Sequence, residues 1–450
     1  MDRKVFVEQC LERAKALYDE AEVYLEDSVS SSISLYNGDL DEFELAETGG
    51  VQLLVCKGDR WAQAYSEEIS PEAIDFLLEK VAAGVEVAAA TPERSLYLAA
   101  EDESVPELKA KESFQFEADQ VMASLRELNA TLSRQAKEQG AEIRMGKVAL
   151  QYTAASSLLS NSRGLQRESS GNYALAYVYV IVARGDEMKS GVDFQVLHNL
   201  QDLDADKLAK TALERALETY GAKSTAPGKY RVVLDQETFA KLLVASLSMA
   251  FSAEQVQKGL SLLKAKLGQQ LASKCLTIYD FPASEENPMP LIYDGEGVPT
   301  QKLPLIEDGY LRNYLYNLET AQKDGKTSTG SAGRSYKSQS TPALSFMYVQ
   351  PGEKDFDALL REAADGLLIT DLQGLHSGLD PISGDYSLPA VGFLIKDGKK
   401  DRPVNQITIA GNILDTLKQI VELGSDAQFT VMGHYTPSVL IDDIAVSGEA

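Results

Sequence analysis

The chain has 450 residues, of which 44% are hydrophobic and 25% are charged, and its 43 Lys and Arg residues against 68 Asp and Glu residues leave a net charge of −25. This composition is that of an ordinary soluble globular protein, and the length predicts two domains, with three as the alternative. The negative charge argues against direct binding to nucleic acid or to anionic membranes, because both require basic surface patches.

The cysteines and the apolar segments bear on the cellular location. Cys10, Cys56 and Cys275 are far apart in the sequence and form no CxxC pair, which predicts free thiols in a reducing compartment and no thiolate metal site. The N-terminus is charged and lacks a long apolar run, and no segment has the ~20 apolar residues of a membrane span. We therefore expect a cytoplasmic protein with no signal peptide and no membrane contact.

The first half of the chain predicts helices mixed with antiparallel strands. Helical spacing of apolar residues predicts a helix over residues 3–19, and short alternating segments with turns at Asn37-Gly38 and Lys57-Gly-Asp59 predict a small antiparallel sheet. The strands of that sheet are expected at 21–25, 32–36, 50–56 and 60–65. Helices at about 71–90, 116–139 and 205–220 and long paired strands between 142 and 200 complete this half.

The second half is richer in short strands. Residues 222–228 have the composition of a linker, so we place the domain boundary between 225 and 226. A strand over 230–234 leads into the apolar helix that contains residues 241–252, and further helices are expected near 355–365 and 413–423. Strands and helices do not alternate in a βαβ rhythm, so the predicted class is α+β. Residues 1–225 would form an N-terminal domain of antiparallel sheets and helices, and residues 226–450 a β-rich C-terminal domain.

Side chains suited to catalysis are scarce. The chain has three histidines, His198, His376 and His434, and no two of them have the spacing of a metal site. His376 and His434 could meet in the fold with Asp371 or Asp380, but polar loop positions are the simpler interpretation. The sequence has no G-x-S-x-G, and its Gly-rich loop at 324–333 lacks the G-x-x-x-x-G-K-[ST] pattern that cradles phosphate. Residue types alone therefore indicate no catalytic constellation.

Several segments nevertheless match a known family in order. They are Asn161-Ser-x-Gly164, Asp294-Gly-Glu-Gly-Val298, Ser328-Thr-Gly-Ser-Ala-Gly333, Gly366-Leu-Leu-Ile-Thr-Asp-Leu372, Ser383-Gly-Asp-Tyr-Ser387, Gly392-Phe-Leu-Ile-Lys-Asp-Gly398, Thr408-Ile-Ala-Gly-Asn412 and Pro437-Ser-Val-Leu-Ile441. With these segments the chain resembles the TldD/PmbA family, also called the modulator of DNA gyrase family, over essentially its whole length. The Gly-Asp-Tyr-Ser and Thr-Ile-Ala-Gly-Asn segments are the more specific part of the resemblance.

The family has two branches, and the apolar helix distinguishes them. TldD-type relatives carry H-E-x-x-x-H on this helix, with two His ligands and a Glu around a metal, and a Cys near the C-terminus as a further ligand. With the leucines in register, Val244 and Met249 stand at the His positions, Ala245 at the Glu position and Met432 at the Cys position. The chain thus resembles the other branch, PmbA or TldE, and the resemblance implies no catalytic residue, no metal and no cofactor. We expect six residues of this stretch in the core: Leu242, Leu243, Val244, Leu247, Met249 and Phe251.

The resemblance also implies a function. PmbA-type proteins pair with a TldD-type metallopeptidase in a heterodimer that degrades or processes unfolded peptides, peptide antibiotic precursors included. We expect this chain to be the non-catalytic subunit, with a TldD-type subunit or a second copy of itself as the partner. Two alternatives stay open, a self-sufficient hydrolase with an atypical site and a homodimeric peptide-binding protein. Candidates for a peptide cleft or a subunit seam, with structural turns as the equal alternative, are Ser328, Gly330, Gly333, His376, Ser377, Gly384 and His434.

Overall fold

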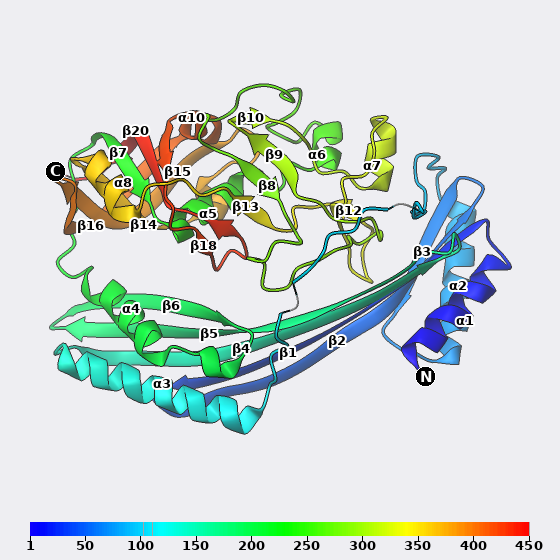
Figure 1. The fold of residues 1–450 in the computed structure, drawn as a ribbon, viewed down its shortest axis with the longest axis horizontal. Helices are drawn as coiled ribbons and strands as arrows, with labels where there is room; N and C mark the ends of the chain where they lie inside the picture. The colour runs from blue at the N-terminus through cyan, green and yellow to red at the C-terminus, as the bar shows by residue number, and fades with distance from the viewer. Residues whose placement is uncertain (102, 110, 450) are drawn as a thin grey trace.

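The computed structural model describes residues 1–101, 103–109 and 111–449, and a long six-stranded antiparallel sheet dominates its N-terminal half (Figure 1). In spatial order the strands are β3 (Arg60–Ser66), β2 (Asp39–Lys57), β1 (Glu20–Tyr36), β4 (Glu142–Asn161), β5 (Gln166–Arg184) and β6 (Glu187–Leu197). The helices of this half are α1 (Arg3–Lys15), α2 (Pro71–Val87), α3 (Ala118–Glu138), the 3-10 helix η1 (Leu200–Asp202) and α4 (Ala205–Leu217).

The two faces of this sheet have different neighbours. Side chains alternate between the faces along a strand, so every second residue of β1 shares a face. The buried residues on one face pack in the clusters beneath the helices: Val23, Leu25, Ile33 and Leu35. On the other face Glu22 pairs with Arg334, and Tyr24 clusters with Tyr336, which are both residues of the C-terminal half. The sheet is therefore the middle layer between four helices and the C-terminal half.

The C-terminal half contains a barrel. Its strands, in spatial order, are β16 (Lys399–Asn412), β15 (Asp385–Lys396), β14 (Gly366–Leu372), β7 (Gly228–Leu234), β20 (Val439–Ser447) and β17 (Ile420–Leu423). Pairing of Thr408–Ala410 of β16 with Ala445–Ser447 of β20 closes the ring of five strands, with β17 outside it. Closure removes the free edges of β16 and β20, and the largest apolar cluster among the described residues contains side chains of the barrel strands, of α5 and of the neighbouring segments 278–349.

A second, irregular sheet lies beside the barrel. Its strands, in spatial order, are β10 (Tyr310–Leu311), β9 (Leu303–Glu307), β8 (Ile278–Asp280), β13 (Met347–Val349), β19 (Tyr435–Thr436) and β18 (Gln428–Phe429), and β11 (Ala332–Gly333) pairs with β12 (Thr341–Pro342). The helices of this half are α5 (Gln236–Leu247), α6 (Ala253–Lys258), α7 (Leu318–Lys323), α8 (Phe356–Ala363), α9 (Leu375–Gly378) and α10 (Ile413–Lys418). Among the described residues no helix is long and apolar enough to cross a membrane.

The predicted α+β class is confirmed, and the predicted helices of the N-terminal half lie within a few residues of their expected positions. The early sheet and the later long strands were expected as separate units, and that was wrong. They form one sheet, because β1 pairs with β2 on one side and with β4 on the other.

The helix expected over 413–423 ends at Lys418 and is followed by β17. The predicted boundary at 225/226 falls between α4 and β7 and stays a prediction. Cys10, Cys56 and Cys275 are free, as expected.

Candidate functional site

Helix α5 is the place where TldD-type relatives would carry their metal motif. Its N-cap is Asp235, whose carboxylate accepts a hydrogen bond of 2.9 Å from the backbone N–H of Thr238. One side of the helix is buried in the large apolar cluster and packs against the barrel, through Phe239, Leu242, Leu243 and Leu247. The opposite side of the helix is half-buried, and we call it the α5 face: Glu237, Lys241, Val244, Ala245 and Ser248.

The prediction that the whole apolar stretch is core is right for four of the six residues. Val244 is half-buried and packs at the margin of the cluster, and Met249 is 61% exposed, which contradicts the prediction. Met249 lies beyond the last residue of α5, so helical spacing no longer decides which way its side chain points.

The α5 face offers no set of metal ligands. Val244 and Ala245 have hydrocarbon side chains, and the thioethers of Met249 and Met432 are poor ligands for zinc. The ammonium of Lys241 on this face lies 2.7 Å from a carboxylate oxygen of Asp371 on β14. Over the described ranges, no three His, Cys, Asp or Glu side chains gather as a group that could hold a metal. A divalent metal therefore does not fit this face.

Glu237 is the titratable group of the α5 face with the most shifted pKa. Both oxygens of its carboxylate lie within 3.3 Å of the backbone nitrogen of Val431, which donates to them. Burial raises the pKa of Glu237 to about 7, with the neighbouring carboxylate of Asp235 acting in the same direction. The group can therefore exchange a proton near neutral pH.

His376 and His434, which the sequence offered as a possible metal-binding pair, lie in different surroundings. His434 accepts a hydrogen bond of 3.1 Å at Nδ1 from the backbone N–H of Met347, and its ring is tilted against Phe346. Burial lowers the pKa of His434 to about 4, so the ring is neutral at physiological pH. His376 is exposed on the short helix α9. His434 thus has a structural role between β13 and β19, and the fold does not assemble the pair into a metal site.

The Gly-rich loop candidates form an internal turn. Ser328 donates to the carbonyl of Tyr316 (3.2 Å), and Gly333 pairs with Thr341 in the small β11–β12 ladder. Gly330 has a φ of +69°, and a Cβ at this position would lie 2.2 Å from the carbonyl oxygen of Pro299. This backbone approach, rather than an open cleft, accounts for the glycine.

Of the candidates in the second loop, one is structural and two are accessible. Gly384 is buried with a φ of +82°, and its carbonyl accepts from the backbone N–H of Ile413. Ser377 is exposed beside His376, and its hydroxyl donates to the carbonyl of Gly374. The accessible candidates are therefore His376 and Ser377.

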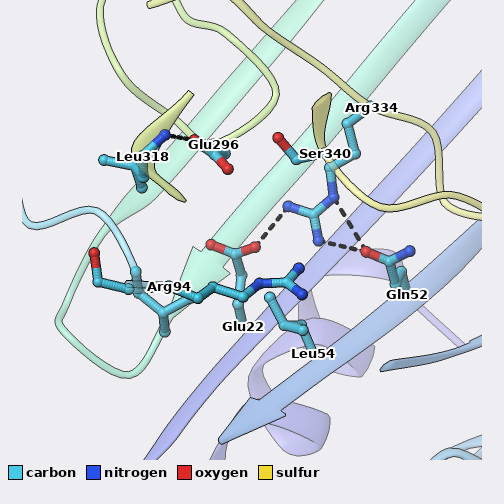
Figure 2. Close-up of a pocket in the computed structure, with 10 residues that line it drawn as sticks. Glu22, Gln52, Leu54, Arg94, Glu296, Leu318, Arg334 and Ser340 are labelled. Carbon is cyan, nitrogen blue, oxygen red and sulfur yellow. Dashed lines mark hydrogen bonds and ion pairs between the residues drawn. The ribbon is translucent and has the colours of Figure 1, made fainter. Parts of the chain in front are cut away.

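Sequence reasoning missed a buried polar cluster between the N-terminal sheet and the C-terminal half (Figure 2). The guanidinium of Arg334 lies 2.6 Å from Glu22 of β1 and 2.6 Å from the amide oxygen of Gln52 of β2. The Arg334 and Glu22 side chains are only 2% and 3% exposed. Glu296 accepts from the backbone N–H of Leu318 at 2.8 Å, and Asp294 accepts from Ala332 at 3.0 Å. We call Glu22, Gln52, Asp294, Glu296 and Arg334 the Arg334 junction.

The electrostatics of the Arg334 junction follow from its burial. Loss of water raises the pKa of Asp294 and of Glu296 and lowers the pKa of nearby Arg94. The free volume between these side chains is only about 10 Å³, at most the space of one water molecule. The junction is a closed contact and not a ligand pocket. Its signal in the sequence was the Asp294-Gly-Glu-Gly-Val298 segment, which was noted for resemblance alone.

Comparison with known proteins covers most of the chain. Models of the PmbA/TldA metallopeptidase match residues 21–86 as domain 1, residues 111–220 as the central domain and residues 227–448 as the C-terminal domain. The chain belongs to the PmbA/TldA metallopeptidase family. A metalloprotease PmbA from Escherichia coli O157:H7 is 27% identical over 98% of this chain and 95% of its own. A metalloprotease from Methanothermobacter thermautotrophicus is 26% identical over 89% of this chain and 86% of its own.

Solved structures of family members have the same fold. A protein from Thermotoga maritima, described as a modulator of a DNA gyrase, superimposes with a TM-score of 0.88 at 27% identity, over 99% of this chain and 100% of its own. TldE from Thermococcus kodakarensis superimposes with a TM-score of 0.88 at 22% identity, over 98% of this chain and 100% of its own. The arrangement of the N-terminal sheet against the β-rich C-terminal half is thus that of the PmbA/TldA family.

Proposed function

We propose that this chain is the non-catalytic subunit of a two-chain metallopeptidase of the TldD–TldE kind, which acts in the cytoplasm on unfolded peptides. The observation that carries the proposal is the α5 face, where Val244 and Ala245 stand in place of a metal ligand and a general base. The names of its relatives, metalloprotease PmbA and TldE, support the proposal from the side of the family.

In this proposal the catalytic metal belongs to the partner subunit, and this chain contributes the folded surface that the partner contacts. Helix α5 keeps its packing against the barrel, so the subunit retains the fold that a partner would recognise. Unfolded peptide can bind along strand edges through main-chain hydrogen bonds, which need no particular sequence. Loop 373–387, with the exposed His376 and Ser377, is our candidate for the rim of the peptide cleft or for the subunit seam.

The metal content of the chain purified alone tests the proposal first. We expect less than roughly a tenth of an equivalent of zinc, iron or manganese, because structural metal affinity requires a full ligand set. Close to one equivalent would contradict the proposal and would favour a self-sufficient hydrolase.

Activity gives the second test. We expect no cleavage of an unstructured fluorogenic peptide by the chain alone, and cleavage after addition of the TldD-type chain from the same genome. The matched control is a TldD-type chain with its H-E-x-x-x-H glutamate replaced by Gln, which should leave the mixture inactive. Cleavage by this chain alone that is abolished by His376→Ala would favour the hydrolase alternative.

A further inference from the structure

Strand β2 has a long free edge. Strand β1 pairs with β2 along its length, from Asp39 opposite Tyr36 to Cys56 opposite Glu20. Strand β3 pairs only with Val51–Lys57 of β2. In the described part of the chain no other strand pairs with residues 39–50, so alternate N–H and C=O groups of this segment face away from the sheet.

The free segment also exposes large apolar side chains. Leu40, Phe43 and Leu45 are 57%, 61% and 63% exposed. The register places Leu40 and Phe43 opposite Leu35 and Ile33 of β1, which are buried in the cluster beneath α3. Directly opposite residues share a face of the sheet, so Leu40 and Phe43 lie on the same face as this buried cluster but are themselves exposed. Exposed apolar residues on an unpaired edge are typical of interaction surfaces.

The opposite edge of the same sheet, formed by β6, is covered in part. Helix α4 packs against β6, and a Cβ on Gly191 would lie 2.0 Å from the carbonyl oxygen of Ala212. Arg215 of α4 donates to the carbonyl of Val192 at 2.7 Å and pairs with Asp193 at 3.1 Å. One α4 side chain therefore occupies an outward carbonyl of β6, whereas residues 39–50 of β2 have no such side-chain partner on their backbone among the described hydrogen bonds.

Charge indicates what the β2 edge can bind. The free segment carries five acidic residues and no basic one: Asp39, Asp41, Glu42, Glu44 and Glu47. Lys147 of β4 pairs with only two of them, at 3.1 Å from Asp41 and 3.8 Å from Glu42. If a second copy paired antiparallel about Phe43, Glu42 would face Glu44 and Asp39 would face Glu47, twice each. Like charges directly opposite destabilise a strand pair, and in any register two copies would bring ten acidic residues together along one edge, so charge disfavours self-pairing.

We propose that the free edge of β2, residues 39–50, docks an apolar strand that carries Lys or Arg, contributed by a different chain. This inference rests on the proposed function, and the other chain is the TldD-type partner. Main-chain hydrogen bonds would supply affinity, the apolar side chains would bury Phe43 and Leu45, and opposite charge would select the partner over a second copy.

The test compares two edges of one sheet. The probe is the TldD-type chain from the same genome, and the measured quantity is its dissociation constant for the full-length chain. The double variant Phe43→Lys/Leu45→Lys should weaken binding by about tenfold or more, because it removes apolar contacts and adds positive charges that repel the Lys or Arg side chains of the docking strand. Met188→Lys on β6 is the matched control, since Met188 is 64% exposed on the other edge, and it should change binding less than about twofold.

Hydrogen exchange of the wild-type complex provides the independent readout. Amides within residues 39–50 should exchange more slowly in the complex than in the free chain, and those of β6 should not change. The inference would be overturned if the β2 variant bound the partner as tightly as the wild type, or if only the amides of β6 were protected. Either result would leave the proposed function intact. Absence of any binding to the TldD-type chain would overturn both, and a homodimer abolished by the β2 variant would instead assign the edge to a second copy.

Discussion

The Arg334 junction and the α5 face differ in how they combine charge with accessible space. The junction is dense in charge, with Glu22 and Arg334 almost fully buried, yet its small free volume leaves no room for a substrate. The α5 face is half-open, yet Val244 and Ala245 carry no polar atoms. The junction thus buries charge where two parts of the chain are joined, and α5 packs its apolar side against the large cluster.

The largest expected effect is the loss of Arg334. Arg334→Ala would leave Glu22 buried without its partner, so we expect the free energy of unfolding in urea to fall by about 3–5 kcal/mol. The control is Lys337→Ala, because Lys337 pairs with Glu67 at the surface three residues away and is 51% exposed. That variant should change the free energy of unfolding far less, because solvent screens an exposed ion pair. Equal costs for the two variants would show that burial does not distinguish the junction.

The next effect concerns the turn that leads into the junction. Gly330→Ala would bring a Cβ within 2.2 Å of the Pro299 carbonyl at a φ of +69°. We expect it to lower the unfolding free energy by about 2 kcal/mol more than Gly325→Ala does, because clash adds to backbone strain. Gly325 is the matched control, with a φ of +62° and open space around its Cβ position. If both variants cost the same, strain alone accounts for the glycines.

The smallest effect is the pH dependence contributed by the α5 face. Because burial raises the pKa of Glu237 from 4.5 to about 7, its contribution to stability is full below pH 4.5 and is lost as the pH rises to about 7. Glu237→Gln should therefore gain stability relative to the wild type between pH 5 and pH 8, on the order of 1–2 kcal/mol after allowance for solvent screening.

Two measurements check this pH dependence. Unfolding free energies of both proteins at the two pH values give the difference, and carbon NMR of the Glu237 carboxyl gives its titration midpoint directly. A titration midpoint near 4.5 would mean that water solvates the Glu237 carboxylate. It would weaken the contrast in accessibility and charge between the α5 face and the Arg334 junction.

Part of the candidate site could be predicted from residues alone. The apolar positions Leu242, Leu243, Leu247 and Phe251 are core as expected, because helical spacing puts them on one side of α5 and its continuation. Met249 was misplaced because the helix ends before it. Residue types could not predict that His376 and Ser377 are exposed or that the turn around Gly330 is closed. Both features depend on which segments, far away in the sequence, lie close in the fold.

By itself the sequence determined the helices, the α+β class, the absence of metal ligands at the α5 positions and the family resemblance, because periodicity and residue identity are local properties. Only the tertiary structure decided that the early and late strands form one sheet, that Arg334 reaches Glu22, and that residues 39–50 of β2 pair with no strand on their outer side while Arg215 contacts the edge of β6. These features arise when segments far apart in the chain meet, and the cost of burying a charge or leaving an edge unpaired depends on that meeting and not on the residue alone.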